Sequence, residues 1–570
     1  MDVCIRLESG QTFERHGVVV KRGVRIQFPT DFYDAPQDAY SIDDFRVTLV
    51  RLIPDDSSEL STRIALSSGG VIDLDARDYH LSRAVVVEAK TNLVVRGQKG
   101  TRLVLRFDPA GEIKYNANGF KFVRCANVLL ENLTFTTDRP VNASGRVAAV
   151  DAAERTYDVR IEPDFPIAGR EHILGIDTFD EFGTPDYVLE TYEKRPLGAD
   201  YEVVGEQLVR LKAPIGYDLS GLDVGHRILF RHEIPGNCVL EFNACRGVTL
   251  RDIEIERAMS AGTVISPPSA DFTFERYNIR SPMGSKALFA ENSDGIHVIG
   301  MSGSLVLKDC HFDGLGDDCL NIHGMGGVVK EFDATNGRLV CICRGEGGRE
   351  RPFPQQWASP GDKLVVYDKK TLLEKGRLSV CSFSADGTAI VLPQDIGIST
   401  GDYLANENVF ASVHVSGCTF ANNRARALLL QTENVVVEDC RFRGIALSAV
   451  LVAPDMVYWN EVGPSRNVAI RNCLFEKCAL HPTHGGCLGA VAFKTTHGRP
   501  EKGDFPPGVH KDVRIVGNAF VDCPRGSVFL TSVSGGDVSG NTAVQCGGEL
   551  PTCVACEGIS VNCHSTAVPK

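Results

Sequence analysis

Three aspartates in this chain have the spacing to do acid–base chemistry together. Asp294 ends the run Asn292-Ser293-Asp294, and Asp317 and Asp318 follow Gly316. Asp294 and Asp318 are 24 residues apart, an interval that recurs elsewhere in the chain. Neighbouring carboxylates raise at least one pKa, and glycoside hydrolysis needs a protonated acid beside an ionised carboxylate. We therefore predict that these three aspartates are catalytic. The alternatives are a calcium site or solvated turn residues.

Other polar residues fall near these acids if the register of the repeat described below holds. His297 and His323 are expected to share one column just past the aspartates, in contact with a substrate or in a paired structural role. Arg426 falls on the rung after Asp318, and Gln431 on the rung after His323. We predict that all four contact a substrate, with a plain solvated arginine as the alternative for Arg426.

Two later residues and one earlier residue complete the predicted site. Trp459 is one of two tryptophans and stands two residues before Glu461. A ring face against the apolar side of a sugar, with a carboxylate on its hydroxyl groups, is a common arrangement; core packing of Trp459 is the alternative. His232 lies where a long insertion ends, which places it near the same cleft.

A repeated strand pattern must position these residues. Each copy reads aliphatic, any, aliphatic, any, a turn residue, a small or apolar residue, any, then an apolar or aromatic residue that is usually Phe or Ile. Copies cover residues 128–135, 248–255, 272–279, 305–312, 413–420, 435–442, 468–475 and 513–520. Short strands that recur every 22–24 residues cannot bury a face alone and must stack on their neighbours. We predict an all-β fold, a right-handed parallel β-helix.

Cysteines support this register. The chain has nineteen, with no recurring zinc-type spacing. Cys310, Cys418, Cys440 and Cys473 occupy the phase that other copies fill with Leu133, Ile253 and Tyr277. A column shared with Leu and Ile is interior, so we expect these thiols to be buried and free.

Two long gaps interrupt the repeat, and each opens with strand, Asp turn and strand. We predict small antiparallel β domains that wall a cleft, and a short helix over about residues 54–67 that closes the open end of the core. The predicted segments are an N-terminal cap with the first rungs (1–136), the first inserted domain (137–238), the rungs with the aspartates (239–326), the second inserted domain (327–410) and the C-terminal rungs (411–570).

Composition limits the partners. The chain has 570 residues, 60 Lys and Arg against 73 Asp and Glu, and a formal charge of −13. Nucleic-acid and anionic-membrane surfaces need a basic stripe, so neither is an expected partner. No apolar run is long enough for a spanning helix. The first residues do not form a secretion signal, which predicts a cytoplasmic protein as written, or a periplasmic or secreted one if a signal was removed. The oligomeric state is open, with a homodimer as one alternative.

The motifs resemble two groups of glycosidases. Asn292-Ser293-Asp294 followed by Gly316-Asp317-Asp318 is similar to the NTD and DD motifs of polygalacturonase-type enzymes on a right-handed β-helix. That group's Gly-His-Gly and Arg-Ile-Lys segments, which bind a uronate, do not follow here. The run Gly316 to Gly324, the insertions and the stretch Trp459 to Gly463 resemble glycoside hydrolase family 110 more closely. Val462 departs from that family, which has Ser at this position.

This resemblance implies a function. Members of family 110 are α-1,3-galactosidases that remove terminal galactose from blood-group-B-type glycans, with inversion and without a metal or other cofactor. In those roles Asp317 would protonate the leaving oxygen, while Asp294 and Asp318 would activate water, about 6.5–9.5 Å from the acid. The expected partner is a galactose-terminated oligosaccharide or glycan. Two alternatives stay open: a polygalacturonase-like hydrolase, and a non-catalytic carbohydrate-binding β-helix.

Overall fold

The structure is a computed structural model. It describes residues 2–6, 12–15, 48–53, 55–107, 117–165, 167, 172–181, 183–192, 201–213, 219–232, 237–345, 349–352, 358–384, 388–455, 459–463, 465–481, 487–495 and 505–566. Within these ranges no helix is long and apolar enough to cross a bilayer.

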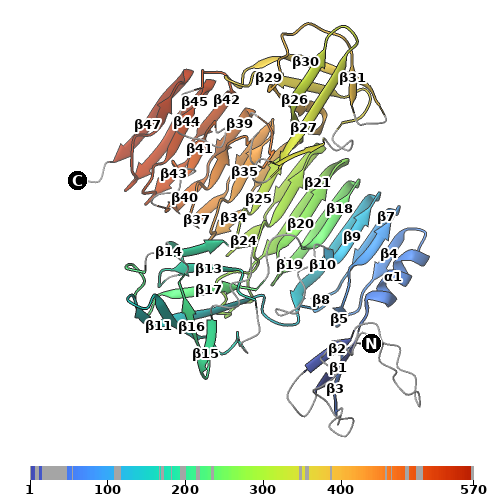
Figure 1. Ribbon diagram of the computed structural model, residues 1–570, viewed down its shortest axis with the longest axis vertical. Coiled ribbons are helices and arrows are strands. Elements are labelled where there is room, and N and C mark those ends of the chain that lie inside the picture. The colour runs from blue at the N-terminus through green and yellow to red at the C-terminus, as the bar shows by residue number, and fades with distance from the viewer. Residues whose placement is uncertain are drawn as a thin grey trace.

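Most of the chain winds into stacked rungs whose strands run parallel (Figure 1). Each rung adds one strand to an eleven-stranded sheet and one or two strands to a larger sheet. The eleven-stranded sheet consists of β6 (Val85–Glu88), β9 (Ala117–Val123), β18 (Cys238–Asn243), β20 (Ala261–Ser266), β22 (Ile296–Ile299), β25 (Leu320–His323), β35 (Leu428–Gln431), β38 (Val450–Val452), β41 (Val491–Phe493), β44 (Val528–Thr531) and β46 (Thr552–Val554).

The larger sheet carries the repeated pattern. Its strands are β4 (Gly70–Asp73), β5 (Asp78–Leu81), β7 (Thr91–Arg96), β8 (Arg102–Leu105), β10 (Ala126–Thr137), β19 (Arg246–Ile255), β21 (Ser269–Ile279), β23 (Met301–Lys308), β24 (His311–Asp313), β33 (Ser412–Ser416), β34 (Thr419–Ala421), β36 (Val435–Glu438), β37 (Arg441–Ile445), β39 (Arg466–Arg471), β40 (Leu474–Cys478), β42 (His510–Val516), β43 (Ala519–Val521), β45 (Val533–Val544) and β47 (Glu557–Thr566). The predicted copies pair in the predicted register, for example Val128 with Val248 and Phe312 with Phe420.

The interior between the sheets is one continuous apolar core. The last residues of successive copies stack as rings: Phe312, Phe420, Phe442, Phe475 and Phe520 have centroids 4.6 to 5.3 Å apart. Beside this ladder of phenylalanines, the predicted cysteine column is buried and its thiols are free, as expected.

Two antiparallel sheets interrupt the rungs, one on each flank in Figure 1. The first contains β11 (Asn142–Asp151), β12 (Thr156–Ile161), β13 (Gly175–Phe179), β14 (Pro185–Tyr192), β15 (Tyr201–Gly205), β16 (Leu208–Lys212) and β17 (Arg227–Arg231). The second contains β26 (Gly326–Asp333), β27 (Arg338–Gly345), β28 (Arg349–Pro352), β29 (Lys363–Tyr367), β30 (Glu374–Phe383), β31 (Ala389–Val391) and β32 (Tyr403–Asn406), and the 3-10 helix η5 (Glu407–Val409) follows it. The predicted fold class, a parallel β-helix with two small antiparallel insertions, is confirmed.

The N-terminal end has one predicted and one unexpected element. Helix α1 (Ser57–Leu66) buries Leu60 and Ile64 against the first rungs, where a capping helix was predicted. Before it, β1 (Asp2–Arg6), β2 (Thr12–Arg15) and β3 (Thr48–Ile53) form an antiparallel sheet that the sequence pattern did not indicate.

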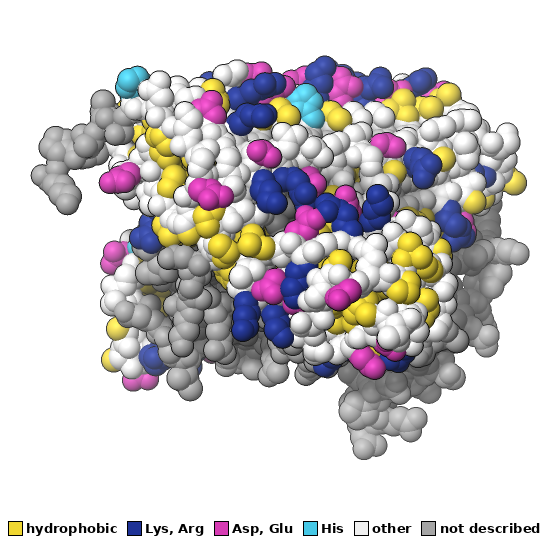
Figure 2. Space-filling view, turned by 90° about the horizontal axis from the view of Figure 1, so that it is seen from above, with side chains coloured by type: hydrophobic (Ala, Val, Ile, Leu, Met, Phe, Trp, Pro, Cys, Tyr) yellow, Lys and Arg dark blue, Asp and Glu magenta, His cyan; other side chains and the backbone are white. Residues whose placement is uncertain are grey.

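The surface has no separate basic stripe on the face shown in Figure 2, where basic and acidic side chains are interleaved. Ion pairs also join neighbouring rungs, for example Arg276 with Asp252 and Arg471 with Glu438.

Candidate active site

Two adjacent turns carry the three aspartates. Asp294 precedes β22, Asp317 and Asp318 precede β25, and the two strands pair with Ile296 opposite Leu320. Backbone hydrogen bonds continue into the turns, from Gly295 N to Asp318 O (2.8 Å) and from Asp317 N to Ser293 O (3.2 Å). The predicted offset of 24 residues therefore places Asp294 and Asp318 side by side.

Glycines allow these turns to approach each other closely. A Cβ atom on Gly295 would lie 2.6 Å from the Cys319 carbonyl oxygen, and one on Gly316 would lie 2.6 Å from the Asn292 carbonyl oxygen. Any larger residue at either position would push the two turns, and with them the acids, apart.

Asp294, Asp317 and Asp318, which we call the aspartate cluster, converge. Each contributes a carboxylate oxygen to a group whose members all lie within 4.8 Å of one another. This spacing is shorter than the 6.5–9.5 Å or so expected between an acid and a base that hold a water between them. Asp294 and Asp318 are buried, whereas the Asp317 side chain is 29% exposed.

Asp318 is held by Arg426. The arginine donates Nε to Oδ1 (2.6 Å) and Nη2 to Oδ2 (2.8 Å), and its backbone N–H also reaches Oδ1 (3.1 Å). Burial raises the pKa of the Asp318 carboxyl to about 8, although the guanidinium opposes that rise. Because each of these hydrogen bonds needs a lone pair on Asp318, the contacts favour the ionised form.

Asp294 is held by a chain of histidines. Its Oδ1 accepts the backbone N–H of Asp318 (3.0 Å), and its Oδ2 lies 2.8 Å from His297 Nδ1. His297 Nε2 is 3.1 Å from His323 Nε2, and His323 Nδ1 is 2.8 Å from the Gly324 carbonyl oxygen. A carbonyl only accepts, so His323 donates there through Nδ1–H and accepts through Nε2 from His297.

His297 therefore carries a proton on each nitrogen when Asp294 is ionised. Burial alone would lower the pKa of His297, but the Asp294 carboxylate raises it above the ordinary value overall. Burial lowers the pKa of His323, in keeping with its neutral role in the chain. The expectation that His297 and His323 share a column is wrong. Asn321 pairs with His297, and the two rings meet diagonally instead.

Asp317 is the least constrained of the three acids. Its carboxylate lies 3.5 Å from Arg426 Nη2. Burial and the neighbouring Asp294 raise the pKa of Asp317, while Arg426, Arg424 and Arg231 lower it. The net rise and the exposed oxygen suit a group that carries a proton and delivers it.

Glu461 and Trp459 lie close together in the chain and differ in their contacts and exposure. Glu461 accepts a hydrogen bond from Asn321 Nδ2 (3.0 Å) and lies with His297 and His323 in a second group within 4.8 Å. Trp459 is half exposed and lies two residues before Glu461. An isolated β-bridge joins Asp455 to Glu461 and closes the bend that contains Trp459.

Gln431 and His232 are less accessible than expected. Gln431 pairs with His323 across β25 and β35, as predicted, but it is fully buried and donates Nε2 to the Ala453 carbonyl (2.6 Å). His232 is buried at the end of β17, with Nδ1 2.7 Å from the His172 carbonyl oxygen. Neither offers more than a small surface to a substrate in this structure.

Three residues that the sequence did not indicate stand behind the cluster. Asp177 on β13 forms ion pairs with Arg231 on β17 (2.8 Å) and with Arg424, which follows β34 (2.9 Å). Asp177 and Arg231 come from the first insertion, and no spacing in the sequence relates them to the aspartates.

Two groups have donors that a metal ion could use: the aspartate cluster, and His297 with His323 and Glu461. Several of these donors already have protein partners, such as Arg426 for Asp318 and Asn321 for Glu461. The absence of a metal from the reaction stays a prediction.

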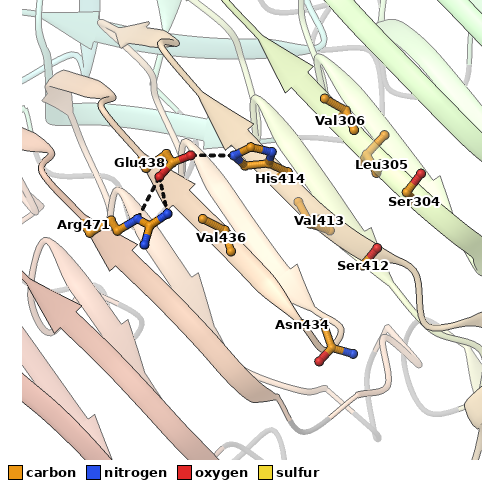
Figure 3. Close-up of a pocket in the computed structure, with 10 residues that line it drawn as sticks. All are labelled: Ser304, Leu305, Val306, Ser412, Val413, His414, Asn434, Val436, Glu438 and Arg471. Carbon is orange, nitrogen blue, oxygen red and sulfur yellow. Dashed lines mark hydrogen bonds and ion pairs between the residues drawn. The ribbon is translucent and has the colours of Figure 1, made fainter.

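Two hollows lie away from the cluster. One, of about 300 Å³, is a shallow groove on β23, β33 and β36, where Glu438 bridges His414 and Arg471 (Figure 3). The other, of about 600 Å³, lies between Arg227 of the first insertion and the loop around Met283. No predicted site residue lines either hollow.

Known proteins resemble this chain over most of its length. An alpha-1,3-galactosidase B from Bacteroides thetaiotaomicron is 24% identical over 514 residues, which cover 82% of this chain and 79% of that protein. An alpha-1,3-galactosidase A from Shewanella woodyi is 25% identical over 450 residues, which cover 75% and 69%. The predicted resemblance is confirmed. The prediction of a glycoside hydrolase is confirmed with it.

No family model matches the chain. Among solved structures, an endo-xylogalacturonan hydrolase from Aspergillus tubingensis aligns with a TM-score of 0.37 and 11% identity, over 90% of this chain and 97% of that one. The A-module of mannuronan C-5 epimerase AlgE6 from Azotobacter vinelandii aligns with a TM-score of 0.39 and 11% identity, over 91% and 97%.

Proposed function

We propose that the chain is an exo-acting, inverting glycoside hydrolase that releases terminal α-1,3-linked galactose from glycans. The observation that carries the proposal is the aspartate cluster, in which three carboxyl groups on two adjacent turns lie in three different environments. The names of the curated relatives support the choice of bond and sugar.

The environments support one distribution of roles. Asp317 is partly exposed and its pKa is raised, so it protonates the glycosidic oxygen as the bond breaks. Asp294 and Asp318 are fixed by His297 and Arg426, and they orient and deprotonate the attacking water. His297 pairs with Asp294 as Arg426 pairs with Asp318.

Inversion is supported by how the two buried carboxylates are engaged, rather than by their distance from Asp317. A retaining enzyme needs a carboxylate oxygen free to bond to the sugar. Both oxygens of Asp318 accept from Arg426, and both oxygens of Asp294 have close partners. With their oxygens engaged in this way, neither carboxylate presents the free oxygen that a covalent sugar intermediate would need.

The charges around the cluster support a neutral sugar. Arg426 is paired with Asp318, and Arg231 and Arg424 are paired with Asp177. A uronate would need a cation to balance it, and these three arginines already face carboxylates. Trp459 and Glu461 offer the ring and carboxylate of a sugar subsite, and contacts from His297 and His323 complete the proposed set.

Exo action is supported by what bounds the cluster. Arg231 of the first insertion donates to the Asn292 carbonyl (3.3 Å), and Asn460 of the Trp459 bend donates to the Gly326 carbonyl at the start of the second insertion (2.9 Å). Groups on both sides leave room for a chain end better than for a long polymer.

A substrate screen followed by NMR tests the proposal. Purified protein is incubated with p-nitrophenyl glycosides and with defined glycans that end in α-1,3-linked, α-1,4-linked or α-1,6-linked galactose. We expect release of galactose from the α-1,3-linked glycans, with β-galactose as the first anomer in the proton spectrum. First appearance of α-galactose would contradict inversion. Cleavage of polygalacturonate would favour the polygalacturonase-like alternative, and binding without turnover would favour a carbohydrate-binding module.

A further inference from the structure

One buried carboxylate of the first insertion connects to both turns of the aspartate cluster. Asp177 accepts from Arg231 through Nε to Oδ2 (2.8 Å) and Nη2 to Oδ1 (2.9 Å), and from Arg424 through Nε to Oδ1 (2.9 Å). The side chains of Asp177 and Arg231 are each 3% exposed, and that of Arg424 is 13% exposed. We call these three residues the Asp177 clamp.

The other ends of both arginines hold the turns. Arg231 Nη1 donates to the Asn292 carbonyl (3.3 Å), two residues before Asp294. Arg424 Nη1 donates to the Gly316 carbonyl (3.2 Å), one residue before Asp317. Arg424 is itself fixed by two further hydrogen bonds. Its backbone N–H donates to the Leu315 carbonyl, and its backbone carbonyl accepts from the Tyr187 hydroxyl.

We propose that Asp177 is a positioning residue: through Arg231 and Arg424 it fixes the two turns that carry Asp294 and Asp317. This inference rests on the proposed hydrolytic function. The arginine forks set the distance between the two turns, because both guanidinium groups bind the same carboxylate. A buried carboxylate without partners would be costly, so the three groups hold one another in a single arrangement.

The clamp also acts on the proposed acid through charge. The charged groups that face Asp317 are Asp294, Asp318, Arg426, Arg424 and Arg231. Arg424 and Arg231 lower the pKa of Asp317, against the rise that burial and Asp294 cause. Asp177 neutralises part of that positive charge, so it keeps Asp317 protonated to higher pH.

Asp177→Asn keeps the shape of the side chain and removes its charge. Asp158→Asn is the matched control, because Asp158 lies in the same inserted sheet and also binds one arginine through both oxygens (Arg210, 2.7 and 2.9 Å), away from the cluster. We expect Asp177→Asn to lower kcat on an α-1,3-galactoside by roughly 10- to 100-fold with little change in KM, since small misplacements of reacting groups cost about this much. Asp158→Asn should leave both constants unchanged.

The pH profile separates positioning from simple loss of stability. The alkaline limb of kcat/KM reports deprotonation of the acid. Asp177→Asn leaves two guanidinium groups unneutralised near Asp317, so the limb should move to lower pH. Arg424→Gln removes a positive charge and leaves the pair of Asp177 with Arg231, so the limb should move to higher pH. Opposite shifts in two variants of one cluster would not arise from unfolding.

A second readout does not depend on turnover. Hydrogen exchange of the amides in residues 291–295 and 313–319 should be faster in Asp177→Asn and in Arg424→Gln than in Asp158→Asn. Unchanged exchange in these segments, or alkaline limbs that move in the same direction in both variants, would overturn the clamp. If the wild-type chain cleaved no α-galactoside, the proposed function would fall, and the exchange rates would still decide whether the clamp holds the turns.

Discussion

Asp294, Asp317 and Asp318 have the same side chain and three different sets of neighbours. Asp318 faces a guanidinium, Asp294 faces an imidazolium, and Asp317 faces solvent on one side. Burial raises the pKa of both Asp317 and Asp318, and of these two acids Asp317 is the one with a partly exposed carboxyl group and an accessible proton. This division is what an acid and a base need if both work at one pH.

Asp317→Asn tests the assignment of the acid. The variant cannot protonate the leaving oxygen, so kcat/KM on an α-1,3-linked disaccharide should fall by about 10²–10⁴-fold. An activated aryl galactoside has a good leaving group and should lose much less. Steady-state rates on both substrates measure the difference. Asp313→Asn, four residues earlier and bonded to Asn422, is the control and should lose little on either substrate.

Near-normal turnover of the disaccharide by Asp317→Asn would contradict the assignment. Asp318 would then be the next candidate for the acid, because it shares the turn. In that case Asp318→Asn should show the dependence on leaving group that Asp317→Asn lacks.

The residue-level site was predictable only where the repeat extends to it. The interval of 24 residues correctly brought Asp294 beside Asp318, and the register of the repeat copies on either side of the second insertion placed Gln431 one rung past His323. The same reasoning failed for His297 and His323, since their separation of 26 residues shifts them by one side-chain step, and ring contact then depends on rotamers. Asp177 and Arg231 could not be found, because an antiparallel insertion shares no register with the rungs.

At the scale of the elements, the ladder of phenylalanines ties neighbouring rungs of the C-terminal half together. Phe442 stacks between Phe420 and Phe475 at 5.0 and 4.6 Å and is fully buried. Phe442→Ala should lower the free energy of unfolding by about 3–5 kcal/mol through the cavity it leaves. Chemical denaturation measures the loss, and Phe442→Leu, which fills part of the cavity, should lose less. Equal stability of Phe442→Ala and the wild type would contradict the stacked register.

The turn that carries Asp294 also holds a buried acid with an unusual environment. Glu291 is fully buried, and neither carboxyl oxygen has a partner in the described part of the chain. Burial, and to a lesser extent Asp294, raise the pKa of Glu291 well above its ordinary value. The neutral acid is therefore the form that the fold accepts.

Glu291→Gln should make the fold less sensitive to alkaline conditions. In the wild type, the contribution of Glu291 to stability is fully present below the unfolded pKa, about 4.5, and is lost as pH rises toward the folded value. Glutamine does not titrate, so the variant should gain on the wild type by about 1.4 kcal/mol per pH unit above that point. Denaturation at several pH values measures the gap. Glu59→Gln, exposed on α1, is the control, and a gap independent of pH would contradict a neutral Glu291.

The elements themselves were largely predictable, because period-2 alternation and the recurring interval both report one physical requirement, the stacking of strands on a common core. The capping helix and both insertions follow from breaks in that pattern. The sheet of β1, β2 and β3 could not be predicted, since its three short strands pair antiparallel across a long gap and repeat nothing.

At the scale of the whole molecule, the core shields the cysteine column from solvent. Cys310, Cys418, Cys440 and Cys473 are buried in adjacent rungs, whereas Cys381 and Cys553 are exposed. A thiol reagent should label Cys381 and Cys553 in the native protein and reach the column only after unfolding, because the thiolate must meet the reagent. Mass spectrometry of labelled peptides checks this. Rapid native labelling of the column would contradict the repeat register.

The second insertion lies in the chain between residues of the site that pair with each other, so these residues are synthesised at different times. Asp318 and Arg426 form one ion pair, yet Arg426 is the 108th residue after Asp318 in the chain. At about 5–20 residues per second, a ribosome adds Arg426 roughly 5–20 s after Asp318. The first insertion, with Asp177 and Arg231, is complete before the turn of Asp294 is made. The parts of the site are therefore synthesised in order, beginning with the first insertion. Until Arg424 and Arg426 are added, the nascent chain contains the three aspartates without two of the arginines that face them.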